Sequence, residues 1–200
     1  MLLRSNLGDY STILERLYAS ASRETDSPVL IDTSKSPVYG WMLNATTRHL
    51  VYILHVVRDA RAVAYSIEKR RKRGHKGYAN YSPLRGAVEW RIVNHVTNYL
   101  ERVFNDRYLQ VRYEDFTQSP RETVQHVYQW IDEQTEGIDF RDDSTVHLSP
   151  THTVVGSPHR FETGAVTLRR DGSWRSNLAP SSSQTVERVA RPLLRRYQYL

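Results

Sequence analysis

The sequence predicts an α/β protein whose parallel β-sheet carries helices on both faces. Two observations lead to this class. Short apolar runs of the length of strands alternate along the chain with longer segments in which apolar residues recur at helical spacing. One run, Val51–Val57 (VYILHVV), is apolar toward both sides, as a strand covered on both faces would be. Strands that alternate with helices pair in parallel, because each connection crosses back over the sheet.

The first part of the chain predicts two helices and a strand. Residues 8–24 repeat apolar side chains at helical spacing and are expected to form an amphipathic helix. The apolar run 29–31 follows a Ser-Pro pair, which favours a short buried strand. Pro37 suits the first turn of a helix, where its missing N–H group costs no hydrogen bond, so a second helix is expected to run to about Arg48.

The middle of the chain continues the alternation after the strand 51–57. Asp59 can cap a helix from residue 60 to 73, since its carboxylate can accept backbone N–H groups of the first turn. Four apolar residues share one face of that helix: Ala60, Val63, Ala64 and Ile67. A long helix is expected over 83–104. Its apolar residues are expected to face inward: Val88, Ile92, Val96, Tyr99 and Val103.

The last part of the chain predicts one more strand, two helices and long loops. Tyr108–Val111 is expected to be a third short strand, and Pro120–Asp132 a helix with an apolar stripe. Residues 138–179 show little periodicity and are expected to be loops of the kind that carry function. A final helix is expected over Thr185–Tyr197.

Composition and charge limit what the chain can do. With 200 residues and no repeat or low-complexity linker, residues 1–200 are expected to form a single domain. No apolar run approaches the roughly 20 residues that cross a bilayer, and the first residues lack the apolar stretch of a secretory signal. The chain has no cysteine, which excludes disulfides and thiolate sites and makes the cytoplasm the expected compartment. The net charge of +6 favours an anionic partner.

Arg58–Arg61 (RDAR) joins the strand 51–57 to the following helix. Ligands of open parallel sheets bind at the carboxyl ends of strands. A helix N-terminus there presents free N–H groups and the positive end of its dipole to a phosphate. The Arg58 guanidinium can add a bidentate contact to that phosphate. An ion pair of Arg58 with Asp59 or Glu68 is the alternative that the residues leave open.

The longer string Val57–Ser66 (VRDARAVAYS) resembles the 3′-phosphate-binding motif of the sulfotransferases that use 3′-phosphoadenosine 5′-phosphosulfate (PAPS) as sulfuryl donor. In that family an arginine at the strand end and a serine eight residues later hold the 3′-phosphate. Arg58 and Ser66 match them in type and in spacing. The resemblance implies a three-layer fold like that of the P-loop NTPases, transfer of a sulfuryl group to a hydroxyl or amine, and no need for a metal.

Other segments resemble the same family in the same order. Ile31–Pro37 (IDTSKSP) resembles its second strand and the Ser-Lys turn after it. Lys35 is therefore the candidate that stabilises charge on the leaving phosphate, and a solvated lysine in a turn is the alternative. Val111–Phe116 (VRYEDF) resembles a later block of the family. The general base is not assigned, and His55 is expected to be a packed, hydrogen-bonded core histidine.

Two C-terminal segments complete the resemblance. His152–Phe161 resembles the loop that covers the cofactor, where Arg160 stands at the family's spacing from a glycine and a serine replaces the usual asparagine. Leu168–Trp174 resembles the C-terminal part of bacterial members. By this resemblance Arg160 is a candidate phosphate contact, and Arg169 or its neighbour Arg170 is another.

The opening segment of the family has no counterpart in the first 28 residues. Its members begin with a strand and a Gly/Ser/Thr-rich loop that cradles the 5′-phosphosulfate, and no such loop precedes residue 29. The fold is therefore expected to be N-terminally truncated. The chain is then either a weakened sulfotransferase or an inactive remnant that binds the product nucleotide 3′-phosphoadenosine 5′-phosphate (PAP). A sheet without its first strand has a free edge or an exposed apolar face, which predicts marginal stability or self-association. The sequence does not indicate whether the acceptor is a small molecule, a glycan or a lipid.

A cluster of cations suggests a function of another class. Residues 69–76 hold six Lys or Arg residues, which would suit a nucleic-acid or acidic-glycan binding module. Cations near the end of a helix also favour its dipole, so a solvated helix end is an equal explanation. A nucleic-acid partner is disfavoured, because such a module has no need for the Arg58 and Ser66 spacing or for the Lys35 turn.

Overall fold

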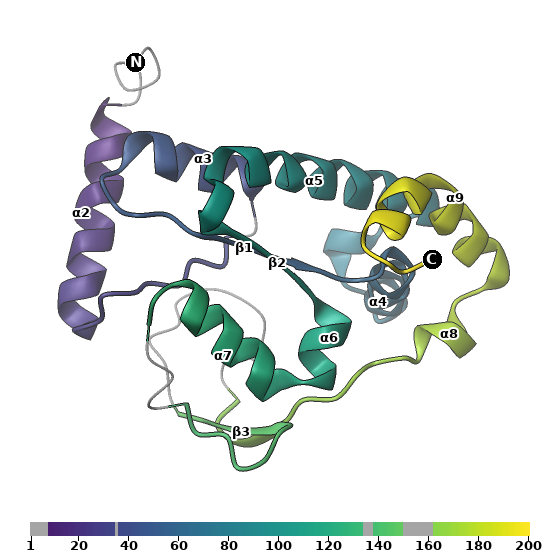
Figure 1. The fold of residues 1–200 in the computed structure, drawn as a ribbon. Helices are drawn as coiled ribbons and strands as arrows, with labels where there is room; N and C mark the ends of the chain where they lie inside the picture. Colours follow the sequence, from purple (N-terminus) through teal and green to yellow (C-terminus); the bar gives the residue numbers. More distant parts are fainter. Residues whose placement is uncertain (1–7, 35, 134–137, 150–161) are drawn as a thin grey trace.

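The computed structural model describes residues 8–34, 36–133, 138–149 and 162–200, and it has the mixed helix and strand content of the expected α/β class (Figure 1). The helices are α2 (Gly8–Thr25), α3 (Pro37–Thr46), α4 (Ala60–Lys72), α5 (Pro83–Phe104), α6 (Tyr113–Gln118), α7 (Pro120–Trp130), α8 (Trp174–Asn177) and α9 (Pro180–Arg196). The strands are β1 (Ile53–Val57), β2 (Tyr108–Arg112), β3 (Thr145–Leu148) and β4 (Gly164–Thr167).

The helix starts follow the capping residues of the sequence. Ser36, Asp59 and Ser82 cap α3, α4 and α5 by accepting a backbone N–H of the first turn. Pro37 and Pro83 stand in the first turns of α3 and α5, where proline costs no hydrogen bond. These starts confirm three predicted helices. None of the helices in the described ranges combines the length and the apolar character needed to cross a membrane.

The central sheet has two strands in place of the predicted three. β1 pairs in parallel with β2, residue by residue from Ile53↔Tyr108 onward. The prediction that both faces of β1 are covered is wrong. His55 is buried on one face, whereas Leu54 and Val56 on the other face are 44% and 52% exposed. β1 therefore alternates between buried and exposed residues, as a strand with one covered face does.

The segment 29–34 corrects the predicted buried strand at 29–31. Neither sheet of the described residues includes this segment, and Ile31 is 84% exposed. Local hydrogen bonds hold the segment instead. Tyr18 of α2 donates to the Asp32 carboxylate, which also accepts the Ser34 N–H at 2.7 Å. An Asp that bonds the backbone two residues on favours a turn over a strand.

Regular structure also forms where loops were predicted. β3 and β4 pair antiparallel, from Thr145↔Thr167 to Leu148↔Gly164, and α8 follows them within the predicted loop region 138–179. β3, β4 and α8 each have only four residues, which is too short for periodicity to reveal them. The helix α6 between β2 and α7 was not predicted either, and α9 begins five residues before the predicted start.

The main core joins β1 to α4, α5 and α9. Its buried members include Val57, Ala64, Trp90, Val186, Leu194 and Tyr197. The predicted inward face of α5 is wrong, because four of its residues are 37% to 61% exposed: Val88, Ile92, Val96 and Tyr99. α5 buries the opposite face, which consists of Ala87, Trp90, Asn94, Thr97, Leu100 and Phe104. In Figure 1, α9 lies beside the N-terminal half of α5 and closes this side of the core.

His55 is a packed core histidine, as predicted. Its Nδ1 lies 2.7 Å from the Tyr108 hydroxyl of β2, and its Nε2 lies 2.9 Å from Oδ1 of Asn94 in α5. Burial lowers the pKa of His55, which favours the neutral ring. A neutral ring can accept from the tyrosine and donate to the amide, so His55 joins the two strands to α5.

Candidate functional site

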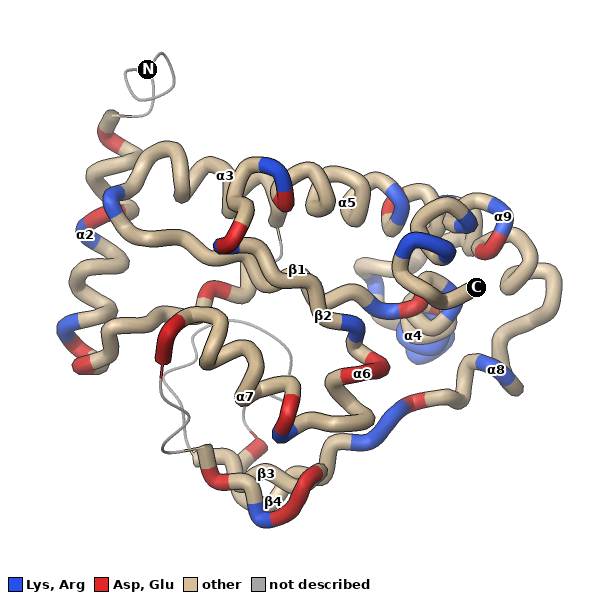
Figure 2. The backbone as a smooth tube through the Cα atoms, viewed as in Figure 1, with Lys and Arg blue, Asp and Glu red and all other residues tan. Residues whose placement is uncertain are grey.

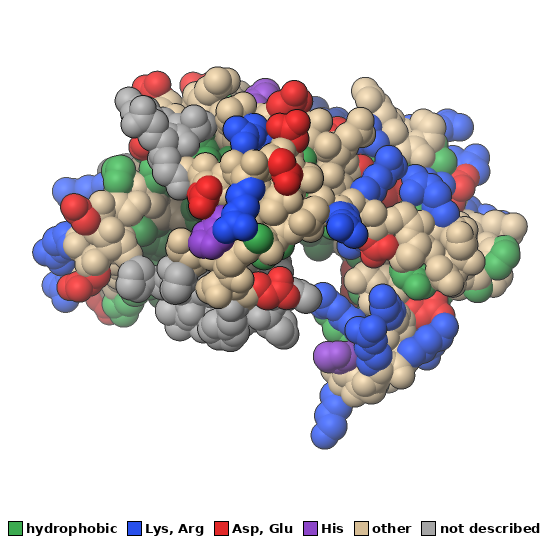
Figure 3. Space-filling model, turned by 90° about the horizontal axis from the view of Figure 1, so that it is seen from below, with side chains coloured by type: hydrophobic (Ala, Val, Ile, Leu, Met, Phe, Trp, Pro, Cys, Tyr) green, Lys and Arg blue, Asp and Glu red, His purple; other side chains and the backbone are tan. Residues whose placement is uncertain are grey.

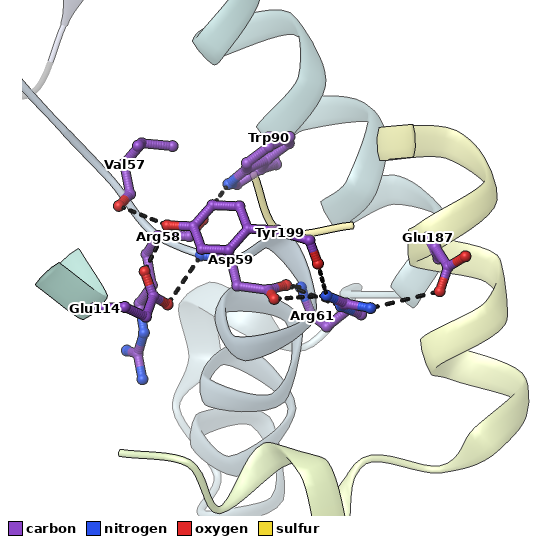
Figure 4. A network of polar contacts seen from close by, with 8 residues as sticks. All are labelled: Val57, Arg58, Asp59, Arg61, Trp90, Glu114, Glu187 and Tyr199. Carbon is purple, nitrogen blue, oxygen red and sulfur yellow. Dashed lines mark hydrogen bonds and ion pairs between the residues drawn. The ribbon is translucent and has the colours of Figure 1, made fainter. Parts of the chain in front are cut away.

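Asp59 and Arg61 build the first turn of α4 (Figure 4). Asp59 is buried, and its Oδ1 accepts the Arg61 backbone N–H at 2.8 Å. The Arg61 side chain returns to the same carboxylate, with Nε 3.0 Å from Oδ1 and Nη2 2.8 Å from Oδ2. Glu68 pairs with Lys72 at 2.7 Å. Both acidic residues that sequence reasoning offered as partners of Arg58 are therefore engaged elsewhere.

Arg61 also ties this turn to the C-terminal part of the chain. Its Nη2 donates to the Tyr199 carbonyl at 3.0 Å, and its Nη1 lies 3.5 Å from Glu187 Oε2 on α9. Its guanidinium lies 4.8 Å from the ring centroid of Trp174, which is buried against Ala62. The start of α4 is thus held from two sides, and Arg58 stands directly before it.

The Arg58 side chain leaves this turn with its charge only partly satisfied. Its guanidinium lies 4.6 Å from the Tyr113 ring centroid, and its Nη2 lies 3.5 Å from Asp171 Oδ2. Its Nε is buried and has no hydrogen-bond partner among the described residues. A buried donor without a partner is destabilising, and a bound anion would satisfy it. In this structure the Asp171 carboxylate lies where such an anion would interact.

Ser66 follows Tyr65 on α4, and Tyr65 packs against the cluster of Ala62, Trp174 and Leu178. The pKa of Asp171 in the segment after β4 is lowered, first by hydrogen bonds from Ser173 and then by the charges of Arg58 and Lys69. Asp171 is therefore close enough to both Arg58 and Lys69 for their charges to act on its carboxylate. Ser66 precedes Lys69 by three residues and so shares its face of the helix. The structure shows no direct contact between Arg58 and Ser66, so a ligand would have to join them.

The other predicted site residues are less constrained. Arg169 and Arg170 are exposed and directly precede Asp171, whose carboxylate pairs with Arg58. Lys35 and Arg160 lie outside the described residues. No group of three or more His, Asp or Glu residues in the described part of the chain could hold a metal ion.

Sequence reasoning missed several residues of this site. Tyr113 and Glu114 follow β2 directly, and the carboxyl ends of parallel strands meet at one edge of the sheet. Their place after the predicted strand 108–111 was therefore a usable signal. Asp171 and Tyr199 gave none, because only the tertiary fold brings them to Arg58.

A second charged surface covers the C-terminal end of α4. Lys69–Arg73 and Lys76 are exposed. Figure 2 shows Lys and Arg concentrated on this helix, and Figure 3 shows such side chains gathered on a projecting part of the molecule. Near this surface Arg70 donates to the Tyr78 hydroxyl at 3.2 Å. One helix thus carries Arg58 at its start and a basic surface at its end.

Fold and site together define the class of protein. It is an α/β protein that presents an arginine and a helix N-terminus at the carboxyl edge of a parallel sheet, a place suited to an anionic ligand. The sequence model of the sulfotransferase family matches residues 6–137, which is 132 of 200 residues. The chain therefore belongs to the sulfotransferase family.

A solved structure is similar in fold. The sulfotransferase domain from the curacin biosynthetic pathway superposes with a TM-score of 0.60 at 18% sequence identity, over 90% of this chain and 67% of that chain. No curated protein matches the chain. Family and fold together support a sulfotransfer function in general terms.

Proposed function

We propose that the chain is a sulfotransferase that uses PAPS as its donor and holds the 3′-phosphate of PAPS at the turn between β1 and α4. The observation that carries this proposal is the Arg58 guanidinium, whose buried Nε lacks a partner among the described residues and whose Nη2 faces a carboxylate. A phosphate offers oxygens in the geometry that two guanidinium donors can bind together. The N-terminus of α4 adds its dipole and its free N–H groups.

The family resemblance extends this proposal to five residues. Arg58 and Ser66 would hold the 3′-phosphate, and Arg160 and Arg169 would add contacts from the C-terminal segments. PAPS supplies the sulfuryl group when it is bound. Lys35 would stabilise the negative charge that develops on the phosphate oxygen as that group leaves, an interaction stronger in the transition state than in the ground state.

The acceptor and the assembly are part of the same proposal. The acceptor would be a hydroxyl or amine on a small molecule, a glycan or a lipid. Among the residues that the structure describes, β1 and β2 each have a hydrogen-bonded neighbour strand on one edge only. A free strand edge can pair with another chain, so we retain self-association through the sheet edge as a proposal.

The test is calorimetric titration of the whole chain with PAP, which carries the same adenosine and 3′-phosphate as PAPS. The wild type is expected to bind PAP. Arg58→Ala is expected to bind about 10- to 150-fold more weakly, which corresponds to one lost charge-assisted contact of roughly 1.5–3 kcal/mol. Arg85→Ala is the matched control, because Arg85 is exposed on α5 and pairs with Glu89 at 2.7 Å. It should bind PAP like the wild type.

Three other results are informative. Equal affinity of the wild type and Arg58→Ala would contradict the assignment of the 3′-phosphate to this turn. Binding of PAP without sulfuryl transfer from PAPS to a phenol, a sugar or an amine would favour the nucleotide-binding remnant. A folded wild type that does not bind PAP would favour the exposed basic surface at 69–76 as the functional feature, with an acidic glycan or nucleic acid as its ligand.

A further inference from the structure

Both peptide groups that flank Arg58 are held by side chains from distant parts of the chain (Figure 4). The peptide before Arg58 presents the Val57 carbonyl, which lies 3.2 Å from the Tyr199 hydroxyl and shares the single proton of that hydroxyl with the Glu114 carboxylate. The peptide after it presents the Arg58 carbonyl, which accepts from Trp90 Nε1 at 3.1 Å. Peptide groups are planar, so holding one on each side fixes the Cα of Arg58 and the direction in which its side chain leaves.

Glu114 holds a third backbone group of the turn. Its Oε1 accepts the Asp59 N–H at 3.3 Å, and its Oε2 accepts the Tyr199 hydroxyl at 2.5 Å. Glu114 is only 8% exposed. A buried carboxylate is costly unless hydrogen bonds satisfy it, and here each oxygen has one. This carboxylate therefore joins the start of α4 to the segment that follows α9.

Tyr199 is itself held in place on both sides. Its carbonyl accepts from Arg61 at 3.0 Å, and its ring centroid lies 4.6 Å from the Arg112 guanidinium. Burial and the hydrogen bond to Glu114 raise the pKa of Tyr199 well above its usual range. The hydroxyl therefore stays protonated and remains a donor at ordinary pH.

We propose that Tyr199 and Glu114 are positioning residues for the contact between Arg58 and the 3′-phosphate. Neither is assigned to the phosphate itself. They act by fixing the backbone on both sides of Arg58, so that its guanidinium is directed at the ligand before the ligand arrives. This inference rests on the proposed function, and it adds a requirement outside the motif 57–66. The segment after α9 becomes a condition for phosphate binding.

A merely structural role would predict a different pattern. Loss of stability would affect every ligand of the folded chain alike, whereas misdirection of Arg58 affects only the group that Arg58 binds. PAP and adenosine 5′-phosphate differ in the 3′-phosphate alone. The ratio of their two affinities therefore reports positioning separately from stability.

The experiment titrates Tyr199→Phe with both nucleotides and records its melting temperature. We expect the affinity for PAP to fall about tenfold and the affinity for adenosine 5′-phosphate to change less than about twofold. The matched control is Tyr197→Phe. Tyr197 is also buried and its hydroxyl bonds Asn98 at 2.8 Å, away from the turn. This control should lower the melting temperature and leave the ratio of the affinities unchanged.

A second variant gives an independent reading if Tyr199→Phe does not fold. Glu114→Gln keeps an acceptor for the Asp59 N–H but replaces the charged acceptor of the Tyr199 hydroxyl. We expect its affinity for PAP to fall about threefold and its affinity for adenosine 5′-phosphate to stay unchanged. An unchanged ratio of affinities in both variants, or an equal loss for both nucleotides, would overturn this inference alone. A wild type that does not bind PAP would overturn the proposed function and this inference with it.

Discussion

Asp171 pairs with the Arg58 guanidinium and would have to release it to a bound phosphate. It lies 3.5 Å from Arg58 Nη2 and is half exposed. Hydrogen bonds from Ser173 and the nearby cations lower its pKa, so it is ionised at neutral pH and would compete for Arg58 with a phosphate bound as proposed. We predict that Asp171→Asn binds PAP about two- to fivefold more tightly, the range expected for an exposed ion pair. Calorimetric titration measures this directly.

A matched variant separates this competition from a general change in charge. Asp143 is exposed and pairs with Arg121 at 3.7 Å, so Asp143→Asn removes the same charge away from the site. It should leave the affinity for PAP unchanged. Weaker binding by Asp171→Asn would show that the carboxylate supports the site and does not compete with the ligand.

At the scale of the element, α5 presents an apolar face to solvent and buries a face that combines apolar and polar residues. Leu100 is 3% exposed, whereas Ile92 on the solvent-facing stripe is 57% exposed. We predict that Leu100→Ala lowers the free energy of unfolding by about 2–5 kcal/mol, because it leaves a cavity. Ile92→Gln should change it by less than about 0.5 kcal/mol. Urea denaturation measures both values. A large loss in Ile92→Gln would mean that this face is covered in solution.

The same helix shows how far sequence reasoning reaches. Its ends were predictable, because Ser82 and Pro83 are local signals of a helix start. Its buried face was not, because the more apolar stripe is the exposed one. The buried stripe contains Asn94, whose Nδ2 donates to the Trp90 carbonyl and whose Oδ1 meets His55. A polar residue satisfied by tertiary hydrogen bonds can be buried, and no pattern along the chain reveals those partners.

The candidate site could likewise be predicted from the sequence only in part. The motif that contains Arg58 and Ser66 is local, so the sequence could indicate it. The order of strand, turn and helix around it was also predictable from the apolar run and from Asp59. The groups that hold the turn come from α5, α6 and the segment after α9. Only the fold shows that Glu114 and Tyr199 meet there.

At the scale of the whole molecule, His55 predicts how stability depends on pH. Burial lowers its pKa in the folded state below the ordinary value of 6.5. The unfolded chain therefore binds this proton more readily, so stability is complete above pH 6.5 and falls as the pH decreases below it. We predict a lower melting temperature at pH 5.5 than at pH 7.5, with a slope of at most about 1.4 kcal/mol per pH unit from this one group.

Two variants test that assignment. His55→Gln should remove most of the difference between the two melting temperatures, whatever its effect on stability at pH 7.5. His95→Gln should preserve the difference, because His95 is exposed on α5. If the difference persisted in His55→Gln, another group would be responsible for the loss of stability in acid.

The distance along the chain between the turn and the residues that hold it has a consequence during synthesis. Tyr199 stands 142 positions after Val57, and Glu114 stands 55 positions after Asp59. At 5–20 residues per second, about 7 to 28 s separate the appearance of Val57 from that of Tyr199. Throughout that interval the arginine motif exists without Tyr199. A growing chain would therefore hold the 3′-phosphate more weakly until Tyr199 has been added.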